Sequence, residues 1–240
     1  MNKTSQIVCA LCGPAFATIF TVGWWFMAGY VPPHDPILNA AEVAAFYQEN
    51  TLSIRLGILL AMISTALVIP FGAVIAIQMK RIEGDVAPIL STVEMMAATV
   101  TSVILLVATV MWTAAAFRPE RTAEIILAYN DFAWILLLMT FSPFLAQFTA
   151  FGFVILADKR KPPLFPRWAG YFNFWLAVIA APGGLITFFK SGPFAWNGLL
   201  AFWLPIVVFV AWFFVMAPLL IQAIRRDDLK ADGDTPGAQT

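Results

Sequence analysis

The sequence predicts an all-α, polytopic integral membrane protein: a six-helix transmembrane bundle with a short amphipathic helix in its first outer loop. Three observations lead to this prediction. The chain is 61% hydrophobic and only 12% charged, whereas soluble domains are about half apolar and a quarter charged. Its Asp, Glu, Lys and Arg residues leave six long intervals almost free of charge. The basic residues also gather in alternate connections between these intervals.

Each interval is long enough to cross a bilayer, because about 20 apolar residues span roughly 30 Å of hydrocarbon. The sixth begins after Ser191-Gly192-Pro193, which is typical of a turn. Residues 1–226 are therefore expected to form a single transmembrane domain, and the Asp-rich residues 227–240 a disordered cytoplasmic tail. The predicted spans are about 7–31, 55–79, 88–116, 132–157, 169–189 and 196–224.

The connection between the first two spans contains the signals of a short helix. Asn39 followed by Glu42 is typical of a capping box, in which a side-chain acceptor meets a free amide at the helix start. Val43, Phe46 and Tyr47 then recur at helical spacing, which predicts an amphipathic helix on the outer face of the bilayer. Two roles fit this helix: a lid over an outward-facing cavity, or a connector with an apolar underside.

The basic residues predict the orientation, because short cytoplasmic loops collect Lys and Arg. Of the fourteen, ten fall on one side of the predicted bundle and four on the other. This asymmetry favours a cytoplasmic location for both termini. The larger set is Lys3, Lys80, Arg81, Lys159, Arg160, Lys161, Arg167, Arg225, Arg226 and Lys230, and the smaller set is Arg55, Arg118, Arg121 and Lys190.

Glu94 places a carboxylate inside the third predicted span. Glu94, Ala98, Thr101, Ser102 and Thr109 fall close to one helical stripe. A small and polar face of this kind either packs and bonds against another helix or forms one wall of a hydrated path. A cavity facing the stripe would favour ligand handling, and a packed helix or another chain would favour a subunit role.

Further candidates come from other spans. Gln147 lies at a depth similar to that of Glu94, whereas Arg55 opens the second span from the opposite face and is expected to contact an anion or to anchor the interface. Trp175 and Trp203 belong to the aromatic-rich fifth and sixth spans, which fit either an apolar ligand pocket or a lipid-facing surface. The candidate ligand-binding residues are Glu94, Gln147, Arg55, Thr101, Trp175 and Trp203.

The residue inventory argues against several chemistries. His34 is the single histidine, so no histidine pair exists to ligate haem or a metal centre. The sequence has no glycine-rich phosphate loop and no nucleophile beside a histidine base. Acidic and basic residues balance, which gives no electrostatic case for nucleic acid. We therefore expect no cofactor, no metal and no nucleic-acid partner, and the balance leans away from an enzyme.

Three segments carry a family resemblance: NAAEVAAFYQENTLSIRLG, PLFPRWAGYFNFW and FKSGPFAWNGLLAFWLP. They resemble segments of an uncharacterised group of bacterial multi-pass membrane proteins. The resemblance covers most of the chain. It implies six helices in a bacterial inner membrane and supplies no activity, ligand or site.

The leading hypothesis is a non-enzymatic membrane protein that binds or translocates a hydrophobic or weakly polar small molecule. The aromatic half would be its apolar wall, and Glu94, Gln147 and Arg55 its polar handles. The alternative is an accessory or assembly subunit whose aromatic faces contact a partner protein or another copy of the chain. A third hypothesis is proton-coupled transport through Glu94. Membrane lipids are expected partners in every case.

Overall fold

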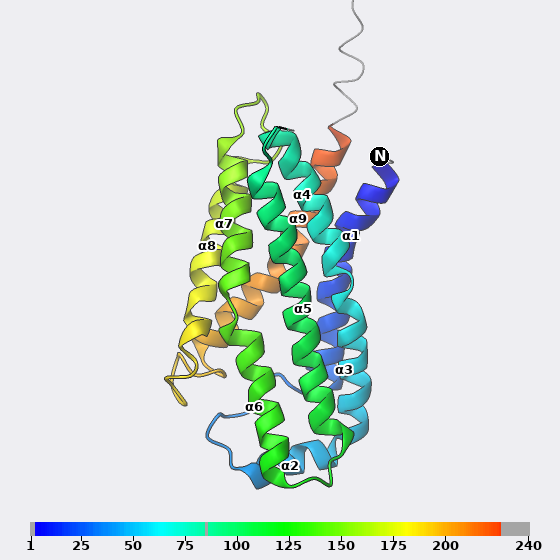
Figure 1. Ribbon diagram of the computed structural model, residues 1–240, viewed down its shortest axis with the longest axis vertical. Coiled ribbons are helices and arrows are strands. Elements are labelled where there is room, and N and C mark those ends of the chain that lie inside the picture. Colours follow the sequence, from blue (N-terminus) through cyan, green and yellow to red (C-terminus); the bar gives the residue numbers. More distant parts are fainter. Residues whose placement is uncertain (1–2, 85, 227–240) are drawn as a thin grey trace, which may run out of the picture.

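The computed structural model describes residues 3–84 and 86–226, and this part of the chain contains helices and no strand (Figure 1). The all-α prediction is therefore confirmed. The predicted tail, residues 227–240, lies outside the described residues. Five helical stretches are long and apolar enough to cross a membrane: Lys3–Met27, Thr51–Glu83, Ile89–Phe117, Ala123–Ala157 and Leu199–Arg225.

The first half of the chain runs up and down the long axis of the molecule (Figure 1). Only Ala66 and Leu67 separate α3 from α4. The break precedes Pro70, which lies in the first turn of α4, where a helix tolerates the missing amide. The elements are α1 (Lys3–Thr21), the π-helix η1 (Val22–Met27), α2 (Ala40–Glu49), α3 (Thr51–Thr65), α4 (Val68–Glu83) and α5 (Ile89–Phe117).

The second half repeats this pattern and then departs from it. α6 (Ala123–Met139) and α7 (Ser142–Ala157) form one helical stretch, Ala123–Ala157, which includes the predicted span 132–157. α8 (Arg167–Ala180) is only 14 residues long and ends in a 3-10 turn, η2 (Ala181–Leu185). The predicted span 169–189 is therefore not among the five long helices. A π-helix, η3 (Leu199–Trp203), then leads into α9 (Leu204–Arg225).

Helix α2 confirms the predicted capping box. The amide of Glu42 donates to Asn39 Oδ1 at 3.1 Å, and the amide of Asn39 donates to Glu42 Oε2 at 2.8 Å. Val43 and Tyr47 are buried on the apolar side of α2, which contacts α6. The helix lies across the lower end of the bundle in Figure 1. Its contacts fit the connector with an apolar underside.

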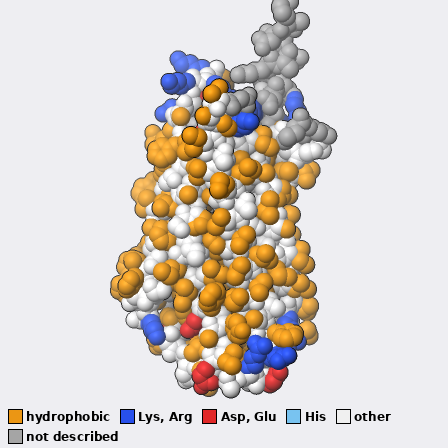
Figure 2. Space-filling model, in the orientation of Figure 1, with side chains coloured by type: hydrophobic (Ala, Val, Ile, Leu, Met, Phe, Trp, Pro, Cys, Tyr) orange, Lys and Arg blue, Asp and Glu red, His pale blue; other side chains and the backbone are white. Residues whose placement is uncertain are grey.

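Charged side chains gather at the two ends of the molecule, and hydrophobic side chains cover the band between them (Figure 2). The end where α1 begins and α4, α7 and α9 finish is called the basic end here (upper in Figure 1). It holds Lys80, Arg81, Lys159, Arg160, Lys161, Arg167, Arg225 and Arg226. The opposite end holds Arg55, Arg118, Arg121 and Lys190. The connections at the basic end therefore carry more Lys and Arg residues than those at the opposite end, as the sequence indicated.

Two glycines bring η1 and α3 into backbone contact. A Cβ on Gly57 would lie 2.4 Å from the carbonyl oxygen of Gly23 and 2.6 Å from the amide nitrogen of Ala28. These neighbours are backbone atoms, so they cannot rotate away. Small residues allow such close approach between helices in a membrane, where no hydrophobic force drives helices together.

We expect Gly57→Ala to destabilise the protein by about 1–3 kcal/mol, because the new methyl group overpacks the η1–α3 contact. Unfolding of the purified variant in a mild detergent measures this loss. Leu59→Ala is the control, since Leu59 is 47% exposed on the same helix. Equal stability of Gly57→Ala and wild type would show that η1 and α3 are not held at this distance.

Candidate functional site

A cavity of about 320 Å³ lies among α1, α5, α6, α7, α8 and α9. Small-molecule sites occupy about 300–1,000 Å³, so this volume suits a small ligand. The aromatic rings that line the cavity also contact one another. The ring centroids of Phe16 and Phe213 are 5.1 Å apart, and those of Phe144 and Phe209 are 5.3 Å apart. The aromatic lining residues are Phe16, Phe20, Trp24, Phe144, Phe209 and Phe213, among others.

The cavity lining reaches the surface at α8 and α9, where Ala180 is partly exposed and Val207 and Ala211 are exposed. The two helices are joined where the indole N–H of Trp212 donates to Asn173 Oδ1 at 3.0 Å. Further from the basic end, Ala180 of α8 and Val207 of α9 both line the cavity, and Val207 is 58% exposed. The opening therefore lies in the apolar band of the surface and not at a charged end.

A buried polar cluster lies beside the cavity. Glu94 of α5 is fully buried, and its Oε1 accepts a hydrogen bond from Gln147 Nε2 of α7 at 3.0 Å. Thr101 Oγ1 lies 3.5 Å from Gln147 Oε1. The other carboxylate oxygen, Oε2, has no hydrogen-bond partner among the described residues. One carboxylate, one amide and one hydroxyl thus connect α5 to α7.

The polar stripe on α5 meets packed helices along its length. Ser102 Oγ donates to the carbonyl oxygen of Thr65 in α3 at 3.0 Å. Gly72 of α4 lies against Ala98, since a Cβ on Gly72 would be 2.4 Å from the Ala98 Cβ. A stripe that meets packed helices favours a subunit role, as set out for the sequence. The stripe is not a wall of the cavity, so a ligand-binding function rests on the cavity alone.

The cluster and the cavity are nevertheless neighbours. Leu105 lines the cavity one turn after Thr101 on α5, and Phe148 lines it directly after Gln147 on α7. Thr101, Gln147 and Glu94 do not line it themselves. The structure therefore brings three of the six candidate residues together, behind the wall of the cavity.

The other three candidates lie elsewhere. Arg55 Nε and Nη2 donate to the carbonyl oxygens of Ala116 and Phe117 at 3.1 and 2.9 Å, so this side chain caps the C-terminus of α5. Trp175 is 65% exposed on the surface of α8. Trp203 packs edge-to-face on Trp25 at 6.1 Å and does not line the cavity.

Sequence reasoning missed the contribution of the first helix to the aromatic wall. Phe16, Phe20 and Trp24 recur every four residues, which places them on one face of α1 and η1. The same spacing relates Phe209 and Phe213 on α9. The same four-residue spacing of aromatic side chains in both segments was the sequence signal from which the aromatic wall could have been predicted.

A second aromatic cluster closes the bundle towards the opposite end. Trp24, Trp112 and Trp134 contact one another with ring centroids 5.3–5.8 Å apart. Their indole N–H groups have no acceptor among the described residues. The adjoining Tyr30 hydroxyl donates to the Tyr47 hydroxyl at 3.1 Å. Burial raises the pKa of the Tyr47 phenol well above its usual value.

Comparison with models of protein families, with curated proteins and with solved structures gives no match. The function is therefore argued from the geometry of the cavity and of the polar cluster.

We expect Glu94→Ala to destabilise the protein by about 1–3 kcal/mol, because Gln147 loses its buried acceptor. Glu94→Gln should cost less than about 1 kcal/mol, since an amide oxygen replaces the acceptor and interhelical hydrogen bonds of this kind contribute modestly. Unfolding in detergent compares the two variants. Equal losses in both would mean that the negative charge of Glu94 is itself required.

Proposed function

We propose that the protein binds, or passes through the membrane, a hydrophobic or weakly polar small molecule held in the cavity among α1 and α5–α9. One observation carries this proposal: the 320 Å³ cavity has an almost wholly apolar lining, and none of the described residues that line it is charged. An apolar ligand gains roughly 25 cal/mol for each Å² of its surface that leaves water. A charged ligand would lose its hydration there without compensation.

The proposal places the chain in a bacterial inner membrane with both termini in the cytoplasm. The excess of Lys and Arg at the basic end supports this orientation, and the family resemblance supports the bacterial membrane. A sixth crossing would run through α8 and η2 (Figure 1). This crossing starts at the basic end. Shortly after η2 in the chain, Trp196 Nε1 donates to the carbonyl oxygen of His34 at 2.7 Å. His34 lies in the connection between η1 and α2, at the opposite end.

The position of the opening favours entry from the bilayer. Val207 is exposed and Ala180 is partly exposed, and both line the cavity within the apolar band, which would face hydrocarbon in a membrane. A molecule already dissolved in the bilayer would reach the cavity between α8 and α9 without crossing a charged end. The expected ligand therefore partitions into lipid.

Photolabelling tests this proposal with decanol that carries a diazirine in its alkyl chain. In the wild-type protein, label should concentrate on peptides that contain the cavity residues of α1 and α9. Ala180→Phe places a ring in the cavity mouth and should reduce this labelling several-fold. Peptide mass spectrometry of the irradiated protein, prepared in mild detergent, locates the label.

Val178→Phe is the matched control, because Val178 is 63% exposed on the same helix and does not line the cavity. It should label as wild type. Label spread evenly over the lipid-facing surface in all three proteins would contradict a binding cavity. A stoichiometric protein partner, together with an unlabelled cavity, would instead favour the role of an accessory subunit.

A second candidate function is proton-coupled transport through Glu94. It is favoured by the carboxylate oxygen Oε2, which has no partner among the described residues. Intramembrane carboxylates of this kind serve in proton relays. The cavity residues Leu105 and Phe148 adjoin the cluster, so a proton on Glu94 would lie close to a bound ligand.

Proteoliposomes that enclose a pH-sensitive dye test this candidate. Addition of decanol should move protons in wild-type vesicles, and Glu94→Gln, which cannot exchange a proton, should abolish the signal while still binding the photoreactive decanol. Absence of a decanol-dependent pH change in wild-type vesicles would contradict proton coupling.

A further inference from the structure

A second pocket lies at the basic end, in the connection between α7 and α8. Four cationic side chains line it, from Lys159, Arg160, Lys161 and Arg167. Among the residues that the structure describes, Asp158 is the one acidic side chain in this lining. Figure 2 shows basic side chains clustered over this end of the molecule. The pocket therefore carries an excess of positive charge.

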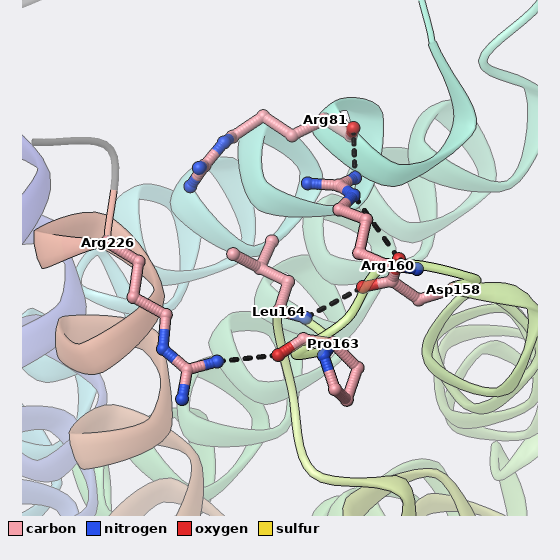
Figure 3. A network of polar contacts seen from close by, with 6 residues as sticks. All are labelled: Arg81, Asp158, Arg160, Pro163, Leu164 and Arg226. Carbon is pink, nitrogen blue, oxygen red and sulfur yellow. Dashed lines mark hydrogen bonds and ion pairs between the residues drawn. The ribbon is translucent and has the colours of Figure 1, made fainter. Parts of the chain in front are cut away.

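Asp158 offsets only one of the four positive charges, that of Arg160, and its carboxylate is held by its own loop. Oδ1 accepts from the amide of Arg160 at 3.1 Å, and Oδ2 accepts from the amide of Leu164 at 2.7 Å. Arg160 Nε also pairs with Oδ1 at 3.2 Å. The carboxylate is thus satisfied from within the loop, as Figure 3 shows.

Three of the four cations are left to face outward. Lys159, Lys161 and Arg167 are exposed, and in residues 3–84 and 86–226 no hydrogen bond or ion pair is found for any of them. The other acidic side chain described near this end, Glu83, accepts from the amides of Leu90 and Ser91 at the start of α5. It is not a lining residue of the pocket.

The loop that presents these cations is fixed by three neighbouring helices. Arg160 donates to the carbonyl oxygen of Arg81 in α4, and Arg226 after α9 donates to the carbonyl oxygen of Pro163 at 2.6 Å (Figure 3). Phe165 is fully buried and packs edge-to-face on Phe151 of α7 at 5.4 Å. A preorganised loop holds its cations together at less entropic cost on binding.

An apolar surface continues from the pocket along α7 and α8. Leu156 lines the pocket itself. Phe153 is 58% exposed one turn earlier on α7, and its ring lies 5.0 Å from that of Phe174 on α8. A ligand with an anionic head and an apolar tail would place its head among the cations and its tail on this surface.

We infer that this pocket binds the phosphate group of an anionic phospholipid headgroup. Lys and Arg suit phosphate because they offer several charged N–H donors, and basic pockets beside membrane helices are known to bind anionic headgroups. The apolar surface below the pocket favours a lipid over a soluble phosphate, which would contact only the cations.

Native mass spectrometry of the full-length protein in mild detergent tests the inference, with phosphatidylglycerol or phosphatidylcholine added as the probe. We expect one phosphatidylglycerol to remain bound per chain. In the double variant Lys161→Gln/Arg167→Gln its affinity should fall about 30-fold, since each basic residue at an anionic surface contributes roughly fivefold. Unfolding in detergent should be unchanged, because both side chains are exposed.

Arg118→Gln/Lys190→Gln is the matched control, with one Arg and one Lys removed from exposed positions at the opposite end. It should retain the lipid. Displacement of phosphatidylglycerol by inorganic phosphate would keep the phosphate site and assign it to a soluble anion. Equal retention of both lipids, or equal affinity in the two double variants, would overturn the inference.

Discussion

The hydrogen bond from Ser102 to the carbonyl oxygen of Thr65 connects the polar stripe on α5 to the break between α3 and α4, and the rest of the fold depends on this connection. In hydrocarbon, backbone polar groups must be satisfied within the protein. The chain nevertheless breaks between α3 and α4, ahead of Pro70. α5 supplies a hydroxyl to a carbonyl at that break, so the polar stripe on α5 and the break in its neighbour support each other.

The same reasoning explains why the stripe combines small and polar residues. Ala98 allows α4 to approach at Gly72, and this proximity brings the hydroxyl of Ser102 within reach of α3. Glu94 extends the pattern to α7 through Gln147. α5 therefore contacts α3, α4 and α7 through one face, while α1, α8 and α9 enclose the cavity beyond α7. The closely packed half of the bundle and the half that contains the cavity share α5 and α7 as their boundary.

The sequence could predict features that depend on local pattern. The capping box at Asn39 and Glu42 needs only three residues of spacing, and the stripe containing Glu94 needs only one helix. The cap that Arg55 forms on the C-terminus of α5 could not be predicted from the sequence, because it depends on where a helix distant in the chain ends. The wall of the cavity was predicted only in part, since Phe209 and Phe213 lie in the predicted aromatic half but α1 supplies the facing rings. Which aromatic faces meet is a property of tertiary packing, and composition does not encode it.

The cavity lies beside the short helix α8. The stretch Ala181-Pro182-Gly183-Gly184 ends the helix at Ala180, and its glycines let η2 lie directly on α6. A Cβ on Gly183 would be only 2.5 Å from the carbonyl oxygen of Leu138. With 14 residues, α8 extends about 21 Å, and Leu176, Ile179 and Ala180 in its last turns line the cavity. Aromatic rings from α1, α7 and α9 line the space that remains. A helix-breaking sequence thus lies at one wall of the cavity, through Gly183, and the buried contacts of α5 hold the neighbouring helices together beside it.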